Sequence, residues 1–253
     1  MKIDLTGKVA LVTGGNGGIG LAIARGLAEA GAAIFIAARN PAKNAAAVGE
    51  LEHAGARAAA AIVDVADETQ CRAMVPAAVA AFGRLDILVN NAGYGTLKRP
   101  EDHSLAEWNA LMATNLTAAF VAAQAAYPEM KRQGGGKIIN IGSLMSFLGG
   151  ANSVPYCTSK GGLLQLTRSL AVAWGRDNIQ VNAILPGWTE TEIADGIKAK
   201  APQTYEAVIK RTPARRWGRP EDNAGLAVFL ASPAADFITG TGIPVDGGYG
   251  VQG

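Results

Sequence analysis

Short apolar runs alternate along the chain with longer segments in which apolar residues recur every three or four positions. The runs predict buried strands, and the segments predict helices that pack one apolar face against those strands. A strand, a helix and a further strand in succession indicate a parallel pair joined by a right-handed crossover. The predicted strands lie at residues 9–12, 33–37, 59–63, 85–89, 137–141, 179–184 and 243–246. The predicted helices lie at about 21–31, 41–53, 68–82, 105–132 (continuous or broken), 156–176 and from 220 onward.

The whole chain, residues 1–253, is predicted to form a single α/β domain, because no composition shift typical of a linker and no internal repeat divides it. Between residues 188 and 217 the apolar pattern weakens and polar residues become more frequent. We expect this stretch to be a mobile, substrate-covering segment rather than a part of the core.

Composition and charge narrow the range of partners. The net charge of +2, without a basic run, argues against nucleic acid and anionic membranes as partners. No apolar run reaches the roughly 18 residues of a membrane span. Cys71 and Cys157 lie far apart and have no metal-binding neighbourhood, so we expect neither a disulfide scaffold nor a metal site. The N-terminus lacks the apolar segment of a signal peptide, and the cytoplasm is the expected location.

A glycine-rich turn follows the first predicted strand and opens the first predicted helix. Its glycines Gly14, Gly18 and Gly20 leave backbone N–H groups and the positive end of the helix dipole accessible to a pyrophosphate. Three residues separate the first two of these glycines, so the spacing differs from the plain GxGxxG fingerprint. The alternative is a turn that only packs the helix against the strand.

The end of the second predicted strand bears on the choice of coenzyme. An acid at this place would bind the adenosine ribose hydroxyls of NAD(H), but the strand ends in Arg39. A guanidinium can bind a 2′-phosphate through two hydrogen bonds, so NADP(H) is favoured and NAD(H) stays open. Arg39 has the alternative of a solvated loop residue. Asp64, after the third strand, is either an acceptor for the adenine amine or a helix cap.

Tyr156 and Lys160 stand four residues apart on a predicted helix, so both side chains lie on one face within reach of one ligand. The ammonium of Lys160 would favour the phenolate form of Tyr156. The same spacing also occurs by chance, as a half-buried tyrosine beside a solvated lysine.

Six motifs occur in order, and together they resemble the short-chain dehydrogenase/reductase family over essentially the whole chain. They are Thr13-Gly14-x-x-x-Gly18-x-Gly20, Asn90-Asn91-Ala92-Gly93, Asn115, Ser143, Tyr156-x-x-x-Lys160 and Pro186-Gly187. The resemblance implies one Rossmann-type domain, a doubly wound parallel sheet of about seven strands with helices on both faces. It also implies a nicotinamide coenzyme and commonly a homotetramer, for which an alanine-rich helix around 118–126 would permit close packing.

The resemblance gives four residues catalytic roles. Tyr156 would be the general acid/base, and Lys160 would bind the nicotinamide ribose and lower the pKa of Tyr156. Ser143 would orient the substrate oxygen, and Asn115 would hold a water that links Lys160 to solvent. Ser143 could instead be an ordinary turn serine, and Asn115 could be a buried polar group of a helix with a local partner.

The resemblance also implies which residues contact the coenzyme. Thr189 stands where the family usually has an aliphatic residue, whereas Thr191 matches the family's hydroxyl. The expected contacts are Gly14, Asn16, Gly18, Ile19, Gly20, Arg39, Asp64, Val65, Asn91, Ala92, Gly93, Tyr156, Lys160, Pro186, Gly187, Thr189 and Thr191.

The substrate is predicted to be a small carbonyl or alcohol compound. The segments 138–150 and 212–218 resemble the sugar-acid dehydrogenases of the family, which favours a keto sugar acid. Alternatives are a 3-oxoacyl-thioester reductase, a dinucleotide-binding regulator without turnover and, least favoured by the charge, a nucleic-acid binder. The expected substrate contacts are Ser143, Met145, Asn152, Tyr156 and Trp188, and Ile193 is a further pocket candidate.

Overall fold

Strands and helices alternate along the chain as the apolar pattern predicts. The computed structural model describes residues 3–191, 194, 198–199 and 201–252. Within these residues, seven parallel strands form one sheet in the order β3-β2-β1-β4-β5-β6-β7. The strands are β1 (Val9–Thr13), β2 (Ala33–Ala38), β3 (Ala58–Ile62), β4 (Ile87–Asn90), β5 (Gly136–Ile141), β6 (Ile179–Pro186) and β7 (Gly242–Val245).

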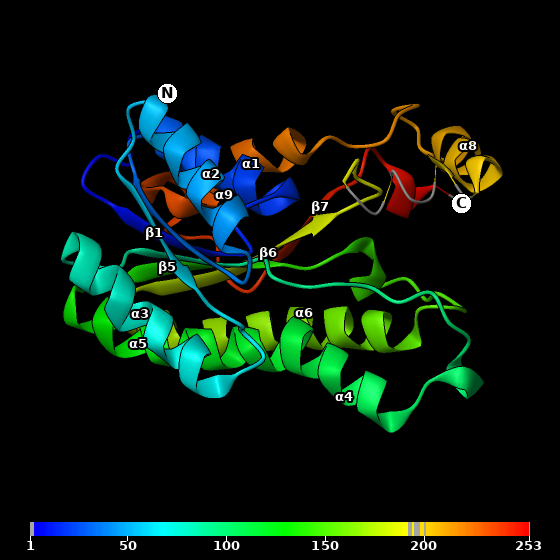
Figure 1. Cartoon of the computed structure of the whole chain (residues 1–253), viewed down its shortest axis with the longest axis horizontal. Helices are drawn as coiled ribbons and strands as arrows, with labels where there is room; N and C mark the ends of the chain where they lie inside the picture. The colour runs from blue at the N-terminus through cyan, green and yellow to red at the C-terminus, as the bar shows by residue number, and fades with distance from the viewer. Residues whose placement is uncertain (1–2, 192–193, 195–197, 200, 253) are drawn as a thin grey trace.

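Helices cover both faces of the sheet, so the predicted doubly wound α/β fold is confirmed (Figure 1). Figure 1 shows α1, α2 and α9 on one face and α3, α5 and α6 on the other. The helices are α1 (Gly18–Glu29), α2 (Pro41–His53), α3 (Glu68–Phe82), α4 (Leu105–Met112), α5 (Ala118–Arg132), α6 (Val154–Trp174), α8 (Pro202–Arg211) and α9 (Ala224–Ala231). None of the helices in the described part of the chain is long and apolar enough to cross a membrane.

The core consists of one apolar layer on each face of the sheet. The layer under α3, α5 and α6 contains Leu11, Leu88 and Val181, and the layer under α1, α2 and α9 contains Val12, Val89 and Ile184. Neighbouring residues of a strand point to opposite faces, so these strands read as continuous apolar runs. All eight residues of β6 are buried.

The strand order reverses direction between β1 and β4, which creates a crevice at the carboxyl ends of the strands. Thr13 at the end of β1 pairs with Ala37 of β2, and Val12 pairs with Val89 of β4. The glycine turn, Arg39 and the turn at Asn91 therefore follow strand ends at this one edge of the sheet.

A capping box explains where helix α4 begins. The predicted capping box is present, because the Ser104 hydroxyl accepts a hydrogen bond from the Glu107 N–H and the Glu107 carboxylate accepts one from the Ser104 N–H. The helical stretch predicted at 105–132 is interrupted by one turn of π-helix, Ala113–Thr117, between α4 and α5. Such turns occur often at functional sites, and this one contains Asn115.

We expected the segment 188–217 to lie outside the core, but part of it is buried. It contains α8, and its residues Val208 and Trp217 are buried together with Leu144 and Tyr249 in a separate small apolar cluster. Its two tryptophans and its tyrosine, together with Tyr249 from near the C-terminus, supply enough apolar area for such a cluster, although the segment looks polar by periodicity. Residues 192–193, with the pocket candidate Ile193, and 195–197 and 200 lie outside the described part.

Candidate active site

The glycine turn places an uncapped helix N-terminus beside tightly packed backbone. Gly14 and Gly18 have φ angles of +62° and +51°, which favour glycine. A side chain at Gly20 would lie 2.4 Å from both the Asn91 Nδ2 atom and the Gly14 carbonyl oxygen. The first turn of α1 has neither a side-chain cap nor an acidic residue. These features fit the pyrophosphate of a dinucleotide.

Two polar side chains fasten the glycine turn to the turn after β4. The Thr13 hydroxyl accepts hydrogen bonds from the N–H groups of Asn91 (3.0 Å) and Ala92 (3.1 Å). The Asn91 amide donates to the carbonyl oxygens of Thr13 (3.0 Å) and Gly14 (3.2 Å). The Asn91 donors therefore shape the turn. Sequence reasoning quoted Thr13 in the motif but gave it no role.

The coenzyme residues expected after β2 and β3 lie at the same edge of the sheet. Arg39 is exposed and, among the residues that the structure describes, has no acidic partner within ion-pair distance. Asp64 is half-buried and accepts a hydrogen bond from the Ala66 N–H at 3.0 Å. It does not cap α3, because Asp67 occupies that place. Val65 is buried.

Ser143, Tyr156 and Lys160 meet where β5 ends and α6 begins. Ser143 follows β5, and its hydroxyl accepts a hydrogen bond from the Met145 N–H at 3.1 Å. Lys160 is 4% exposed, and its Nζ donates to the Ile141 carbonyl oxygen at 2.7 Å. The Nζ atom lies 5.7 Å from the centre of the Tyr156 ring. The predicted Tyr–Lys face of the helix is thus directed at the end of the neighbouring strand.

Burial shifts the pKa of both titratable groups. It raises the pKa of the Tyr156 phenol above its ordinary value, and the hydrogen bond with Ser143 opposes this rise. It lowers the pKa of Lys160 from 10.5 to about 8. The group that lowers the pKa of Tyr156 in this structure is Ser143, and the expected effect of Lys160 on this pKa stays a prediction.

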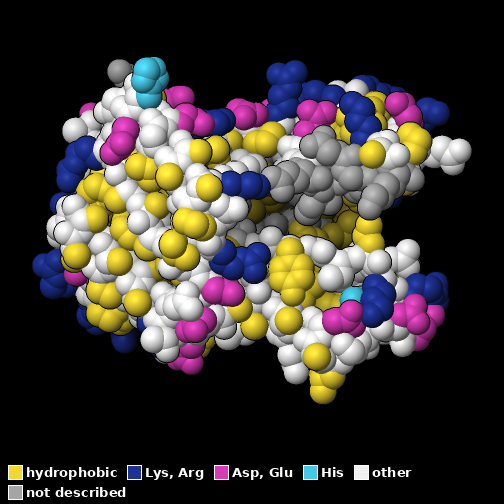
Figure 2. Space-filling view, in the orientation of Figure 1, with side chains coloured by type: hydrophobic (Ala, Val, Ile, Leu, Met, Phe, Trp, Pro, Cys, Tyr) yellow, Lys and Arg dark blue, Asp and Glu magenta, His cyan; other side chains and the backbone are white. Residues whose placement is uncertain are grey.

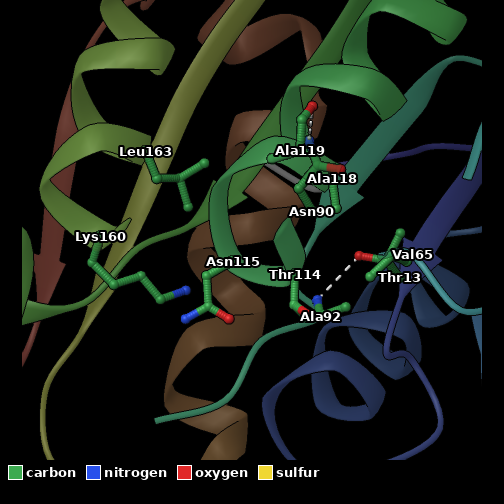
Figure 3. A pocket seen from close by; sticks show the side chains of 10 residues that line it. All are labelled: Thr13, Val65, Asn90, Ala92, Thr114, Asn115, Ala118, Ala119, Lys160 and Leu163. Carbon is green, nitrogen blue, oxygen red and sulfur yellow. Dashed lines mark hydrogen bonds between the residues drawn. The ribbon is translucent and has the colours of Figure 1, made fainter. Parts of the chain in front are cut away.

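The side chain of Asn115 holds the loop next to these groups by bonding the main chain of Tyr94. Its Oδ1 accepts from the Tyr94 N–H at 3.1 Å, and its Nδ2 donates to the Tyr94 carbonyl oxygen at 2.8 Å and to the Ser159 hydroxyl at 3.3 Å. The partners of Asn115 lie 21 and 44 positions away in the sequence, so they are not the local partner of the alternative interpretation. Figure 3 shows Asn115 and Lys160 directed toward each other.

A cavity of about 10 Å³ lies between Asn115 and Lys160 and is lined also by Thr13, Ala92 and Thr114 (Figure 3). A water needs roughly this volume and at least two polar partners, which the Asn115 Oδ1 and the Lys160 ammonium can supply, since each makes one hydrogen bond within the described part of the chain. The water expected beside Asn115 therefore has room.

A buried polar network fixes α6 on the sheet. Asn90 of β4 donates to the Asn140 side-chain oxygen at 2.9 Å, and Asn140 of β5 donates to the Thr167 hydroxyl of α6 at 2.9 Å. Thr167 donates in turn to the carbonyl oxygen of Leu163. The sequence pattern around Asn140 predicts a strand, but it does not predict that Asn140 bonds Thr167 on a helix.

The segment after β6 closes the coenzyme crevice. A side chain at Gly187 would lie 2.7 Å from the Asp246 Cα, so the chain must be glycine here if β7 stays in place. Thr189 bonds the carbonyl oxygen of Gly187 through its hydroxyl, and the Thr191 methyl would lie 3.6 Å from a Cβ at Gly18. Thr191 thus reaches the glycine turn, whereas Thr189 is bonded within its own segment.

The expected substrate residues come from the segment after β5, the start of α6 and the segment after β6. Figure 2 shows a hollow in the surface between the part of the molecule around α8 and the part around α4. Met145 is half-buried, Asn152 is exposed, and the Asn152 carbonyl oxygen accepts from the Lys98 N–H at 2.8 Å. Trp188 packs against Trp217 and Tyr249. Its indole nitrogen is buried without a hydrogen-bond partner among the described residues.

A glycine turn and a Ser–Tyr–Lys group at the carboxyl edge of a doubly wound sheet define a dinucleotide-dependent oxidoreductase. A family model described as enoyl-(acyl carrier protein) reductase matches residues 14–250. The chain belongs to the short-chain dehydrogenase/reductase family and is an NAD(P)-dependent enzyme.

Three relatives show how far the similarity extends. The gluconate 5-dehydrogenase of Gluconobacter oxydans is 40% identical over 249 residues, which cover 98% of this chain and 97% of that protein. The 2-dehydro-3-deoxy-D-gluconate 5-dehydrogenase of Dickeya dadantii is 40% identical, with 97% and 96% covered. A crystal structure of a gluconate 5-dehydrogenase from Burkholderia cenocepacia, in complex with NADP and tartrate, superposes with a TM-score of 0.93 at 42% identity, with 98% and 97% covered.

Proposed function

We propose that this enzyme interconverts a keto sugar acid and the corresponding hydroxy acid, with NADP(H) as coenzyme and Tyr156 as the acid/base. The observation that carries the proposal is the Tyr156 phenol, hydrogen-bonded to Ser143 and with the buried ammonium of Lys160 5.7 Å from the centre of its ring. The sugar-acid dehydrogenases among the relatives support the substrate class. The tartrate in the Burkholderia enzyme, a small hydroxy acid, is compatible with it.

The residues of this chain divide the work of carbonyl reduction. Ser143 and Tyr156 hold the carbonyl oxygen. A nicotinamide coenzyme bound in the crevice would supply the hydride for the carbonyl carbon. Tyr156 then gives its proton to the oxygen, and its raised pKa keeps the phenol protonated for that step. Lys160 and a water in the cavity beside Asn115 pass a proton inward to restore the phenol.

A substrate panel tests the reaction. NADPH oxidation is measured with keto sugar acids, 3-oxoacyl thioesters and simple ketones. We expect keto sugar acids to react fastest, and a much faster reaction of acetoacetyl thioesters would favour the 3-oxoacyl reductase instead. The Tyr156→Phe variant should bind NADPH normally and lose nearly all turnover, because Phe has no proton to transfer. Retention of most of the activity would contradict the role of Tyr156, and a wild type that binds NADPH but reduces nothing would favour a regulator.

The coenzyme preference rests on Arg39. It is exposed and has no acidic partner in the described part of the chain, so its guanidinium is available to a 2′-phosphate. The Arg39→Ala variant should raise the NADPH dissociation constant by about tenfold or more and leave that for NADH nearly unchanged. Titration of coenzyme fluorescence checks this, and equal effects on both coenzymes would exclude the phosphate contact.

Assembly and location complete the proposal. Apolar side chains are exposed on both helical layers, with Phe120 of α5 and Val172 of α6 on one and Phe237 beyond α9 on the other. A homotetramer needs two kinds of contact. Phe120 and Val172 support one of them, and the exposed Phe237 supports the other. The cysteines Cys71 and Cys157 are free thiols, which supports a reducing cytoplasm.

A further inference from the structure

A buried asparagine at the start of α2 connects three parts of the coenzyme crevice. Asn44 is 4% exposed, and its Nδ2 donates to the carbonyl oxygens of Ala38 (2.9 Å) and Ala61 (3.2 Å), at the ends of β2 and β3. Its Oδ1 accepts a hydrogen bond from the Nδ2 of Asn16, in the glycine turn, at 2.7 Å. Asn44 thus bonds both Ala38, the residue before Arg39, and Asn16 in the glycine turn.

These bonds fix which way both amides point. An amide has two N–H donors on one side and a carbonyl acceptor on the other. Because two main-chain carbonyl oxygens take both donors of Asn44, its oxygen must face Asn16. Asn16 must then present its NH₂ group, since a flipped amide would set oxygen against oxygen. One N–H of Asn16 bonds Asn44, and the second N–H is left for a ligand.

We propose that Asn44 is a positioning residue for coenzyme selectivity, because it holds Asn16 in the orientation that donates to the 2′-phosphate of NADP(H). The proposal rests on the NADP(H) preference proposed above. A phosphate dianion only accepts hydrogen bonds, so it depends on a fixed donor. The ribose diol of NAD(H) both donates and accepts, so it binds either orientation of Asn16. Both amide donors and the amide oxygen of Asn44 are bonded within the protein, so Asn44 acts through Asn16.

The test is a double-mutant cycle on coenzyme binding, read from the fluorescence of NADPH and NADH. We expect Asn16→Ala to weaken NADPH binding by about tenfold and NADH binding by less than about twofold. Asn44→Leu should weaken NADPH binding by about fivefold with little effect on NADH. The double variant should be no weaker than Asn16→Ala alone, because Asn44 acts through Asn16. Asn44→Ala removes the same hydrogen bonds without added bulk if the leucine variant does not fold.

The outcomes separate this role from a structural one. If Asn44 only ties α2 to the sheet, its variants lower the melting temperature and weaken both coenzymes alike, and the two substitutions add; that result overturns the proposal. An unchanged NADPH to NADH ratio in Asn16→Ala, whose measurement does not depend on the Asn44 variants, overturns it as well. A wild type without preference for NADPH refutes the coenzyme assignment itself, and the proposal falls with it.

Discussion

Lys160 is the residue whose environment is least ordinary for its type. Its ammonium is buried at the end of β5, where a single carbonyl oxygen is its hydrogen-bond partner in the described structure. Burial disfavours the charged form and lowers the pKa to about 8. The site thus keeps a group that exchanges protons near neutral pH at the expense of stability.

This burial predicts a stability change of unusual sign for the Lys160→Met variant. Because the folded chain binds this proton less tightly than the unfolded chain, the charge opposes folding below pH 8, and the opposition fades as the pH rises toward 10.5. The shift is equivalent to about 3 kcal/mol at pH 7. After the loss of the bond to Ile141, the variant should be about 1–2 kcal/mol more stable than wild type at pH 7.

Urea denaturation at several pH values measures this difference. The advantage of the variant should shrink by about 2 kcal/mol between pH 7 and pH 9.5, while carbonyl reduction is lost at every pH. Lys210→Met, at an exposed position on α8, is the matched control and should show no such trend. A constant difference across this pH range would mean that buried charge is not its origin.

At the same scale, spacing predicted which side chains meet but not how they interact. Four residues on a helix were enough to bring Tyr156 and Lys160 together, because helical geometry depends on sequence separation alone. The bond from Lys160 to Ile141 and the link from Asn16 to Asn44 join residues 19 and 28 positions apart. Such contacts depend on the packing of whole elements, which no local pattern encodes.

At the scale of elements, the glycine turn combines two different demands on glycine. Gly20 is required by packing, since a Cβ there would lie 2.4 Å from Asn91 and from the Gly14 carbonyl oxygen. Gly17 has no atom within 4 Å of its Cβ position and an extended φ of −178° that any residue adopts. Gly20 therefore lets α1 pack closely against the turn after β4, whereas the Cβ position of Gly17 is open.

The contrast predicts different effects of alanine at the two positions. Gly20→Ala should destabilise the chain without coenzyme by about 1–3 kcal/mol, because the Asn91 amide must leave its two carbonyl partners. It should also weaken NADPH binding, since the turn no longer keeps its shape. Urea denaturation measures the first effect and coenzyme fluorescence the second.

Gly17→Ala is the control within the same turn, and its stability should stay within about 0.5 kcal/mol of wild type. Equal losses of stability in both variants would show that the turn resists any side chain, whatever its contacts.

Among the elements, strands and helices with strong periodicity were predicted well, and the segment around α8 was not. The runs at β1, β2 and β6 are apolar throughout because both faces of the sheet are covered. The segment 188–217 buries its aromatic residues against Leu144 and Tyr249, which come from other parts of the chain. Its apolar residues therefore lack the regular spacing that marks a helix against a sheet.

At the scale of the whole molecule, the alanine-rich helix α5 proves to face inward. Five of the alanines that we expected at an interface between subunits, Ala118, Ala119, Ala122, Ala123 and Ala126, are buried within their own chain. The outward face of α5 instead presents Phe120, which is 42% exposed. If subunits pair through this helix, the side chain at their contact is aromatic rather than small.

The proposed homotetramer can be divided into its two kinds of contact. Phe120 lies on α5, in the layer of α3, α5 and α6, and Phe237, fully exposed, follows α9, which covers the opposite face of the sheet. Phe120→Glu places a charge in the first contact, where its desolvation opposes pairing, and leaves the second contact intact. Light scattering coupled to size exclusion should therefore show a tetramer in wild type and a dimer in the variant.

Ile62→Glu is the matched control, because Ile62 is also an exposed apolar residue, at 64%, but lies on the edge strand β3. It should leave the tetramer unchanged, because Ile62 lies on an edge strand of the sheet and on neither helical layer where the two contacts are proposed. A tetramer that persists in Phe120→Glu would move the contact away from α5, and a monomeric wild type would refute the assembly. Because Tyr156 and Lys160 lie within one chain, the dimeric variant should still bind NADPH.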